Sequence, residues 1–233
     1  MKNVVDYSIQ TNPINVDGIP IKFVSTAEHV GVVRSTTGNL PTIFARITAH
    51  KKALGAVIHT GMARSHRGNP RVSLRIERLY GIPVLLSGLS SLIISSKEEH
   101  LIEQHLKDIL SGLQRFHPKT PRAVIYFMGG ILPGPALLHM RQLGLFGMVC
   151  RSPDSILHKL AFNLFHSKII SSNSWFHQIR EYCLQYGLPH PLKLLSSPLS
   201  KYRIKIPVKK HMFAFKGHHG NHPDTHDLRK IQE

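Results

Sequence analysis

Residues 96–116 read SKEEHLIEQHLKDILSGLQRF, and this stretch decides the fold class. Ser96 followed by Glu99 has the spacing of a capping box, which marks the start of an α-helix. Apolar residues then recur at the three- and four-residue spacing of one helical face, with His105 among them: Leu101, Ile102, Ile109, Leu113 and Phe116. The stretch predicts an amphipathic helix, in which Glu98, Glu99 and Glu103 cap the first turn or lie on the solvated face.

Helix start and stop signals recur along most of the chain. Asn39 and Pro41 open one helix, which Gly61 can end. Asn69-Pro70 opens the next, with a kink expected at Pro83 because proline removes a backbone donor. Four more helices are predicted, from Thr120-Pro121 to Gly129, from Leu137 to Cys150, from Ser152-Pro153 to about His166, and from Ser174 to Gly187. Beyond Pro189 the pattern weakens, and a basic segment leads into a His-rich end that is typical of an unpacked tail.

The first 35 residues predict β structure instead. Asp17-Gly18 separates INV from IPIKFV and supplies the positive φ angles of a two-residue hairpin turn. HVGVV, residues 29–33, predicts a third short strand after the polar link 25–28, with Gly31 allowing close backbone packing. The predicted fold class is therefore mainly α with a small N-terminal β-hairpin or three-strand piece, an α+β arrangement.

The charge balance is the strongest signal in the composition. Lysine and arginine number 30 against 13 acids in 233 residues, which gives a net charge of +17. Such self-repulsion does not help a soluble fold, so it indicates a polyanionic partner. Nucleic acid is the first expectation, and an anionic membrane surface or a crowded assembly is the alternative.

Two features bear on location. The N-terminus MKNVVDYSIQ has no apolar signal core, and two cysteines exclude a disulfide scaffold. We therefore expect an intracellular protein, nuclear or cytoplasmic and not secreted. The uncharged run 79–96 has the minimum length of a membrane span, but serine, glycine and proline dilute it, and the run 123–138 is broken in the same way. Both runs favour buried core helices over a two-span membrane protein.

Catalytic constellations are not evident. The acids include no Asp-Asp pair and no Asp-x-Asp or Asp-x-Glu, which a two-metal phosphoryl-transfer site would draw on. His29 has no nucleophile or acid placed beside it by the sequence, which favours a structural histidine. The glycines of Gly129-Gly130-Ile-Leu-Pro-Gly134 lack the Lys-Ser/Thr ending of a phosphate loop. Five histidines crowd the C-terminal segment, but Pro223 interrupts the pair His222 and His226 and no cysteine accompanies them. We predict no metal site and no cofactor.

The basic residues between Arg34 and Arg78 form the candidate site. Glu77 is the single acid in that stretch, and Arg71, Arg75 and Arg78 recur at helical spacing. This pattern favours contacts with a phosphate backbone, which carry no sequence information, while the alternative is a solvated face with excess charge. No aromatic residues interleave with the arginines, so base stacking is not indicated. The predicted nucleic-acid-binding residues are Arg34, Arg46, Lys51, Lys52, Arg64, Arg67, Arg71, Arg75 and Arg78.

Several short motifs follow one another in a distinctive order. They are His29-Val30-Gly31 after the hairpin, Leu79-Tyr80-x-x-Pro83-Val-Leu-Leu86-Ser-Gly88, Thr120-Pro121 with Tyr126, Gly130 and Pro133, and His139-x-Arg141-x-Leu143 running into Phe146-Gly147. Over about residues 1–205 this order resembles the end of the palm, the thumb and the connector of a non-LTR (LINE-type) retrotransposon reverse transcriptase. Valine stands at position 30 where that family has leucine.

The resemblance implies a domain division and a function. Residues 1–35 would be a β-hairpin remnant of the palm, 36–118 a helical thumb-like region, 119–205 a helical connector-like region, and 206–233 a basic, His-rich, disordered tail. The bundle would be an incomplete domain, because the fingers and the Tyr-x-Asp-Asp hairpin would lie upstream of Met1. No catalytic residue of the family therefore has a counterpart here.

The expectation that follows is a fragment of a retroelement reverse transcriptase without polymerase activity of its own. It would bind RNA or an RNA–DNA duplex through the backbone, with weak specificity and without a membrane. The alternative is a free-standing basic helical protein that binds RNA or acts as a scaffold.

Overall fold

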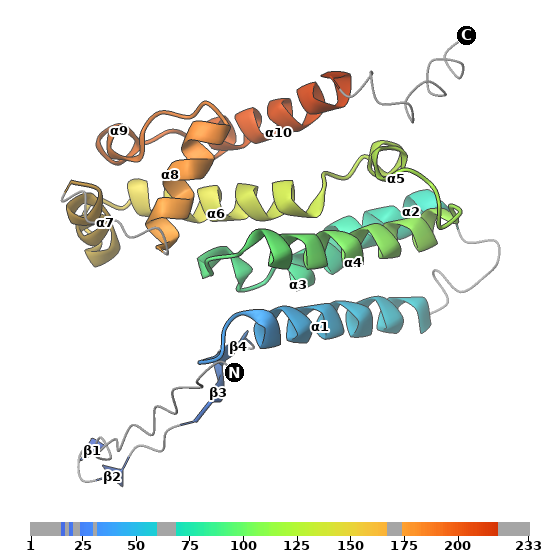
Figure 1. Ribbon diagram of the computed structural model, residues 1–233, viewed down its shortest axis with the longest axis horizontal. Helices are drawn as coiled ribbons and strands as arrows, with labels where there is room; N and C mark the ends of the chain where they lie inside the picture. The colour runs from blue at the N-terminus through green and yellow to red at the C-terminus, as the bar shows by residue number, and fades with distance from the viewer. Residues whose placement is uncertain are drawn as a thin grey trace, which may run out of the picture.

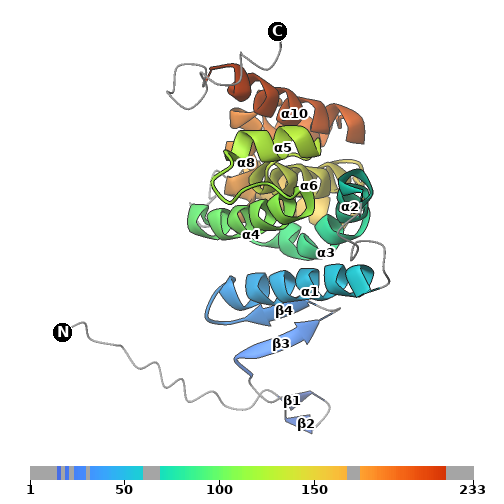
Figure 2. The ribbon, with the colours of Figure 1, turned by 90° about the vertical axis from the view of Figure 1, so that its right-hand side faces the viewer.

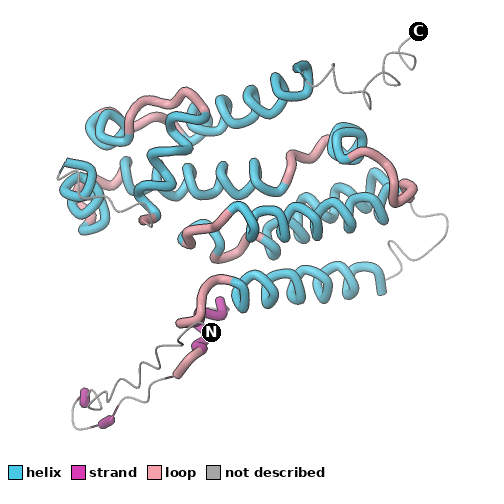
Figure 3. The backbone as a smooth tube through the Cα atoms, in the orientation of Figure 1, coloured by secondary structure: helices cyan, strands magenta, loops and turns pink. Residues whose placement is uncertain are grey.

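The computed structural model describes residues 15–16, 19–20, 24–29, 32–59, 69–166 and 174–218. The strands are β1 (Asn15–Val16), β2 (Ile19–Pro20), β3 (Thr26–His29) and β4 (Val32–Ser35). The helices are α1 (Leu40–His59), α2 (Pro70–Ile76), the π-helix η1 (Glu77–Gly81), α3 (Ile82–Leu85), the 3₁₀-helix η2 (Leu89–Ser91), α4 (Ser96–Gln114), α5 (Arg122–Gly129), α6 (Gly134–Cys150), α7 (Ile156–His166), α8 (Trp175–Gln185), α9 (Pro191–Ser196) and α10 (Lys201–His218). Helices dominate the described residues (Figure 3), which confirms the predicted fold class.

The N-terminal strands form two separate hairpins. β1 and β2 pair antiparallel, with Val16 opposite Ile19, as the sequence predicted. The second hairpin differs from the prediction, because residues 26–28 of the presumed polar link form strand β3 together with His29, and β3 pairs with β4 from Thr26 opposite Ser35 onward. The strand was missed because residues 24–28 are solvent-exposed and show no apolar alternation. Gly31 lies outside the described residues.

Strand β4 connects the hairpin to the helices. The buried Val32 packs against Gly88, where an added Cβ would lie 2.5 Å from a Val32 methyl group. Gly88 also has φ 75°, a left-handed conformation that glycine adopts without strain. Arg34 donates a hydrogen bond to the Ser91 hydroxyl at 2.9 Å, and the hydroxyl of Thr42 in α1 donates to the Val33 carbonyl. A close contact at this joint therefore occurs at Gly88, while the contact predicted at Gly31 stays a prediction.

The segment 70–85 is one helical unit with a π turn in its middle. Asn69 caps α2 by accepting a hydrogen bond from the Arg71 amide at 2.9 Å, and Pro70 occupies the first turn. Pro83 cannot donate to the Leu79 carbonyl, and the wider π turn at Glu77–Gly81 directly precedes it. The predicted irregularity at Pro83 is thus a π-helix.

Helix α4 starts one residue before the predicted position. Ser95 is the N-cap: its hydroxyl accepts from the Glu98 amide, and the Glu98 carboxylate accepts from the Ser95 amide at 2.7 Å. The sequence is ambiguous here, because Ser95 with Glu98 and Ser96 with Glu99 have the same spacing. The shift matters because it leaves Glu99 free for another role.

The helices stack in layers with α6 at the centre. In Figures 1 and 2, α1 lies at one side of the stack and α10 at the opposite side, with α4 and α6 between them. α6 contributes Leu138 to a first core that it shares with α1, α2, α3, α4 and α5. It contributes Leu143, Phe146 and Cys150 to a second core with α7, α8, α9 and α10. A helix that is apolar on most sides is typical of such a buried position.

Polar side chains connect the two cores across residues 90–94. The Gln142 amide in α6 donates to the Leu92 carbonyl at 2.8 Å, and the Gln178 amide in α8 donates to the Ile94 carbonyl at 2.7 Å. The Trp175 indole donates to the Ser90 carbonyl at 2.9 Å. These bonds satisfy backbone carbonyls that neither helix nor sheet pairs, so they position the loop before α4.

The C-terminal region differs from the predicted tail. α9 and α10 are helical, and α10 continues to His218, which includes residues 206–218 of the segment expected to be disordered. Ile204 and Val208 of α10 are buried against α6, and Gly147 of α6 allows this approach, since a Cβ there would lie 2.5 Å from Ile204. The sequence hid this helix because Pro207 interrupts it and its charges mask the apolar spacing. Residues 219–233 lie outside the described residues.

No single described helix has the length and apolar composition of a membrane span. Together, α5 and α6 reach that length and composition, with a bend of 57° between them. The run 79–96 is divided among η1, α3, η2 and the loop before α4.

A buried hydrogen-bonded chain of three side chains joins α1, η1 and α4. His50 lies 3.0 Å from a Glu77 carboxylate oxygen through Nε2 and 2.8 Å from His105 Nε2 through Nδ1. His50 and Glu77 have no exposed surface. With Glu77 ionised, His50 Nε2–H donates to the carboxylate and His50 Nδ1 accepts from His105 Nε2–H. Gly81, four residues after Glu77, provides the room, because a Cβ at Gly81 would overlap the Glu77 carboxylate and lie 2.7 Å from His50 Nε2.

Replacing Gly81 with alanine should therefore destabilise the protein by about 2–4 kcal/mol, because the methyl group displaces a buried carboxylate from its donor. Chemical denaturation measures the change. Gly112→Ala in α4 is the matched control: its Cβ would meet no atom within 4 Å, so alanine there should stabilise the helix by about 0.5–1 kcal/mol. Equal effects of the two substitutions would contradict the proposed packing at Gly81.

Candidate nucleic-acid interface

The structure separates the nine predicted contact residues into groups. Lys51 and Lys52 are exposed on α1, and Arg71 and Arg75 are exposed on α2. The His50–Glu77 hydrogen bond holds α1 beside η1, the helical turn that directly follows α2. Arg64 and Arg67 lie outside the described residues.

Three of the predicted residues have structural contacts. Arg78 donates from Nη2 to the carbonyls of Gly129 and Gly130, at 3.0 and 3.2 Å, where α5 ends. A cation at a helix C-terminus satisfies orphan carbonyls and complements the helix dipole. Arg34 bonds to Ser91, and Arg46 is half-buried on α1. The interface is thus best represented by Lys51, Lys52, Arg71 and Arg75, which form no ion pair with a carboxylate within the described part of the chain.

Four of the acids in the central helices have structural partners. Glu77 accepts from His50, Glu98 caps α4, and Glu103 Oε2 accepts from the Gly134 amide at 2.6 Å. Glu99 Oε1 accepts from His139 Nε2 at 2.9 Å and from the Tyr182 hydroxyl at 3.3 Å. The expectation that Glu99 and Glu103 lie on a solvated face or cap the helix is therefore wrong: both bind α6, and Glu103 is buried.

His139 is the centre of the Glu99 cluster. Its Nε2–H donates to Glu99, so its Nδ1 accepts from the Tyr186 hydroxyl, and its ring stacks on Tyr182 at a centroid distance of 4.0 Å. Burial raises the pKa of both tyrosines, with the Glu99 carboxylate adding to the shift, so the phenols stay protonated as donors. The cluster joins α4, α6 and α8 and exposes no nucleophile.

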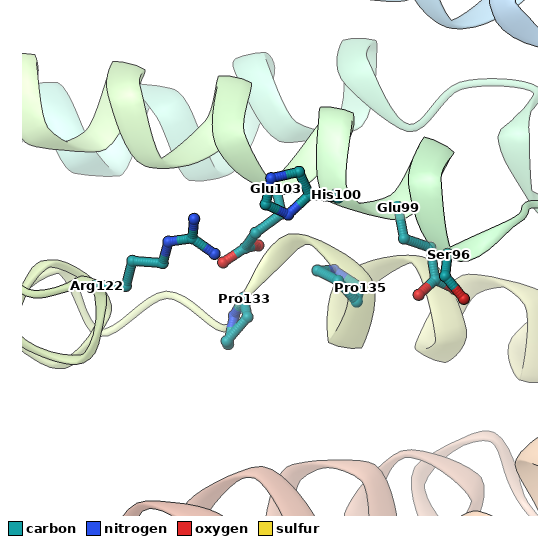
Figure 4. A pocket seen from close by; sticks show the side chains of 7 residues that line it. All are labelled: Ser96, Glu99, His100, Glu103, Arg122, Pro133 and Pro135. Carbon is teal, nitrogen blue, oxygen red and sulfur yellow. The ribbon is translucent and has the colours of Figure 1, made fainter. Parts of the chain in front are cut away.

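A surface pocket lies next to this cluster, between α4 and the start of α6 (Figure 4). It is lined by Ser96, Glu99, His100, Glu103, Arg122, Pro133 and Pro135. Burial raises the pKa of Glu103, while its hydrogen bond from Gly134 and the nearby Arg122 guanidinium oppose the rise. In Figure 4 the Arg122 side chain extends toward the Glu103 carboxylate. Glu99 and Glu103 thus bind His139 and the Gly134 amide of α6, and Arg122 donates to Gln104 of α4, so the pocket's polar groups connect helices and describe a structural site.

The cysteines and histidines do not form a reactive or metal-binding centre in the described residues. Burial raises the pKa of both Cys150 and Cys183 to about 12, so neither thiol is a thiolate at neutral pH. No group of three or more His, Cys, Asp or Glu side chains could hold a metal ion in the part of the chain that the structure describes. Of the crowded C-terminal histidines, His219, His222 and His226 lie outside it.

A second group of cations, which was not predicted as a site from the sequence, lies on α10 and α6. Lys201, Lys205 and Lys209 follow at four-residue spacing on α10, and Arg141 of α6 acts electrostatically on Lys205. The spacing on α10 was visible in the sequence. Arg141 could not be assigned to the group, because only tertiary packing brings it there.

Comparisons with known proteins do not assign the chain. No protein-family model matches it, and neither a curated protein nor a solved structure matches it either. The resemblance to the LINE-type reverse transcriptases stays a prediction from the sequence motifs.

The buried chain of His50, Glu77 and His105 should make stability depend on pH. Burial lowers the pKa of His105 to about 4, and the neighbouring His50 and Lys51 add to the effect. The unfolded state binds a proton near pH 6.5 and the folded state does not, so stability is complete above that pH and falls as the pH drops toward 4. The loss attributable to His105 should reach about 3 kcal/mol.

The test compares urea unfolding of the wild type and His105→Gln between pH 7 and pH 4. Glutamine can keep a donor near the Nε2 position but does not titrate, so the variant should lose less stability over this range. An identical pH dependence in the two proteins would exclude His105 as the cause. Glu103, whose pKa is raised, is common to both proteins and cancels in the comparison.

Proposed function

We propose that the protein binds the phosphate backbone of RNA or an RNA–DNA duplex, without sequence specificity, through the basic helices α1 and α2. The observation that supports this most directly is the separation of charges. Glu77, Glu99 and Glu103 take part in structural hydrogen bonds, whereas Lys51, Lys52, Arg71 and Arg75 are exposed to solvent without an ion pair to a carboxylate among the described residues.

The separation of the acids from the exposed cations affects the electrostatic potential at the protein surface. Exposed cations without a neighbouring carboxylate attract counterions that a polyanion can displace. Counterion release is the main driving force of sequence-independent binding to nucleic acids. The exposed arginines and lysines have the chemistry for phosphate contacts, and the contacts would carry no base information.

The proposed origin is a fragment of a non-LTR retrotransposon reverse transcriptase that lacks the catalytic centre. Its support is the order of motifs along the sequence, and the division into a thumb-like region at 36–118 and a connector-like region at 119–205 is part of the same proposal. We propose that the chain has no polymerase activity of its own, because the Tyr-x-Asp-Asp pair of the family has no counterpart in its sequence. A free-standing RNA-binding protein would use the same basic helices.

Binding is tested with a variant in which Lys51, Lys52, Arg71 and Arg75 are all changed to glutamine. Fluorescence anisotropy with a mixed-sequence RNA–DNA duplex gives Kd between about 50 and 200 mM salt. The wild type should lose affinity steeply with salt. In the variant, the slope of log K against log salt should fall by about 0.9 for each phosphate that the protein no longer neutralises.

The matched control changes four scattered lysines, Lys97, Lys107, Lys119 and Lys159, to glutamine, which lowers the net charge by the same amount. It should keep a slope close to that of the wild type. If the two variants have the same slope, α1 and α2 are not the interface. Primer extension with Mg²⁺ should give no product, and any extended product would refute the proposed lack of polymerase activity.

A further inference from the structure

The face that α10 and α6 share concentrates positive charge in a way that packing alone does not explain. Lys201, Lys205 and Lys209 recur every four residues, so they occupy one side of α10 over about 12 Å of helix. Arg141 of α6 is close enough to affect Lys205 electrostatically. Within the described residues, no carboxylate pairs with any of these four side chains. We call Arg141, Lys201, Lys205 and Lys209 the α10 face.

The like charges of the α10 face destabilise one another. The pKa of Lys205 is lowered by its partial burial and then by Lys201, Lys209 and Arg141, and burial also lowers the pKa of Arg141. The packing of α10 on α6 brings these charges together, through Ile204 and Val208 against the Gly147 region. Arg151 of α6 strengthens the arrangement by donating to the Leu199 carbonyl at 3.0 Å, just before α10 begins. A fold that holds four cations together without an acid leaves a site that an anion would neutralise.

We propose that the α10 face is a second binding site for the phosphate backbone of RNA, separate from α1 and α2. A helix length of about 12 Å corresponds to about three or four phosphates along one strand of a duplex, which matches the three lysines. Figures 1 and 2 place α10 and α1 on opposite sides of the stack, with α4 and α6 between them. The two sets of cations therefore belong to different surfaces, and the α10 face does not depend on the proposed role of α1 and α2.

Two observations favour RNA over an anionic membrane. Helices that bind membranes in the interfacial plane expose an apolar stripe beside their basic residues, but Ile204 and Val208 of α10 are buried against α6. Tyr202, which is 72% exposed, lies between Lys201 and Arg203 and offers a ring on which an unpaired base can stack. A purely electrostatic contact with lipid head groups would require neither the burial of Ile204 and Val208 nor the exposed ring of Tyr202.

The first test changes Lys201, Lys205 and Lys209 to glutamine in the full chain. The variant should bind mixed-sequence RNA about tenfold more weakly at low salt, and its slope of log K against log salt should be smaller by about 0.7–0.9 for each phosphate left without a lysine. Its thermal midpoint should equal or exceed that of the wild type, because glutamine relieves the repulsion around Lys205. The control is a variant with Lys97, Lys107 and Lys119 changed to glutamine, and binding equal to that control would overturn the proposal.

The second test is lysine acetylation followed by mass spectrometry, with and without RNA. RNA should protect Lys201, Lys205 and Lys209 but not Lys97 or Lys119, both in the wild type and in the variant that lacks the α1 and α2 cations. Protection of the α10 face in that variant would support this site even if the proposed α1–α2 interface were wrong. Protection by phosphatidylserine vesicles and not by RNA would overturn the choice of partner.

Discussion

The Glu77 carboxylate has no access to water, and the hydrogen bond that it accepts from His50 determines how the N-terminal helices meet. An unpaired buried charge is too costly to keep, so α1 must place His50 within reach of η1. His105 of α4 then completes the chain by bonding the other nitrogen of His50. Three helices are fixed by three side chains, in a space that exists because residue 81 has no Cβ.

Other acidic side chains are also used in structural hydrogen bonds. Glu99 and Glu103 connect α4 to α6, one through His139 and the other through the Gly134 amide. Each bond stabilises a helix contact and engages one of the few carboxylates of the chain. The sequence has 30 basic and 13 acidic residues, so acids used in this way leave fewer partners for the cations of the surface.

The sequence predicted most of the helices because their apolar spacing and their caps are local signals. It placed the start of α4 one residue late, since two serines precede two glutamates at equal spacing. It missed β3 because that strand is exposed, and it missed α9 and α10 because Pro207 and a dense set of cations conceal the buried Ile204 and Val208. In each of these cases, the local sequence pattern of the segment did not indicate its secondary structure correctly.

The site was harder to predict, for a different reason. Glu99 accepts a hydrogen bond from His139, 40 residues away, and Arg78 donates to the Gly129 carbonyl, 51 residues away. No local sequence pattern predicts either contact. Four of the nine predicted basic residues stand exposed without an acid partner in the described chain, while Arg78 and Arg34 hold other elements in place. Arg141 joins the lysines of α10 through tertiary packing alone.

Helix α6 has a consequence for how the chain can be divided. Leu138 faces the core of the N-terminal helices, and Leu143 and Phe146, about one and two turns further along, face the core of the C-terminal helices. An N-terminal fragment that ends before α6 would lack Leu138 in the first core. A C-terminal fragment that begins after α6 would lack Leu143 and Phe146 in the second core. Either fragment would expose apolar surface that invites aggregation. The helices on both sides of α6 are therefore best expressed together in one chain.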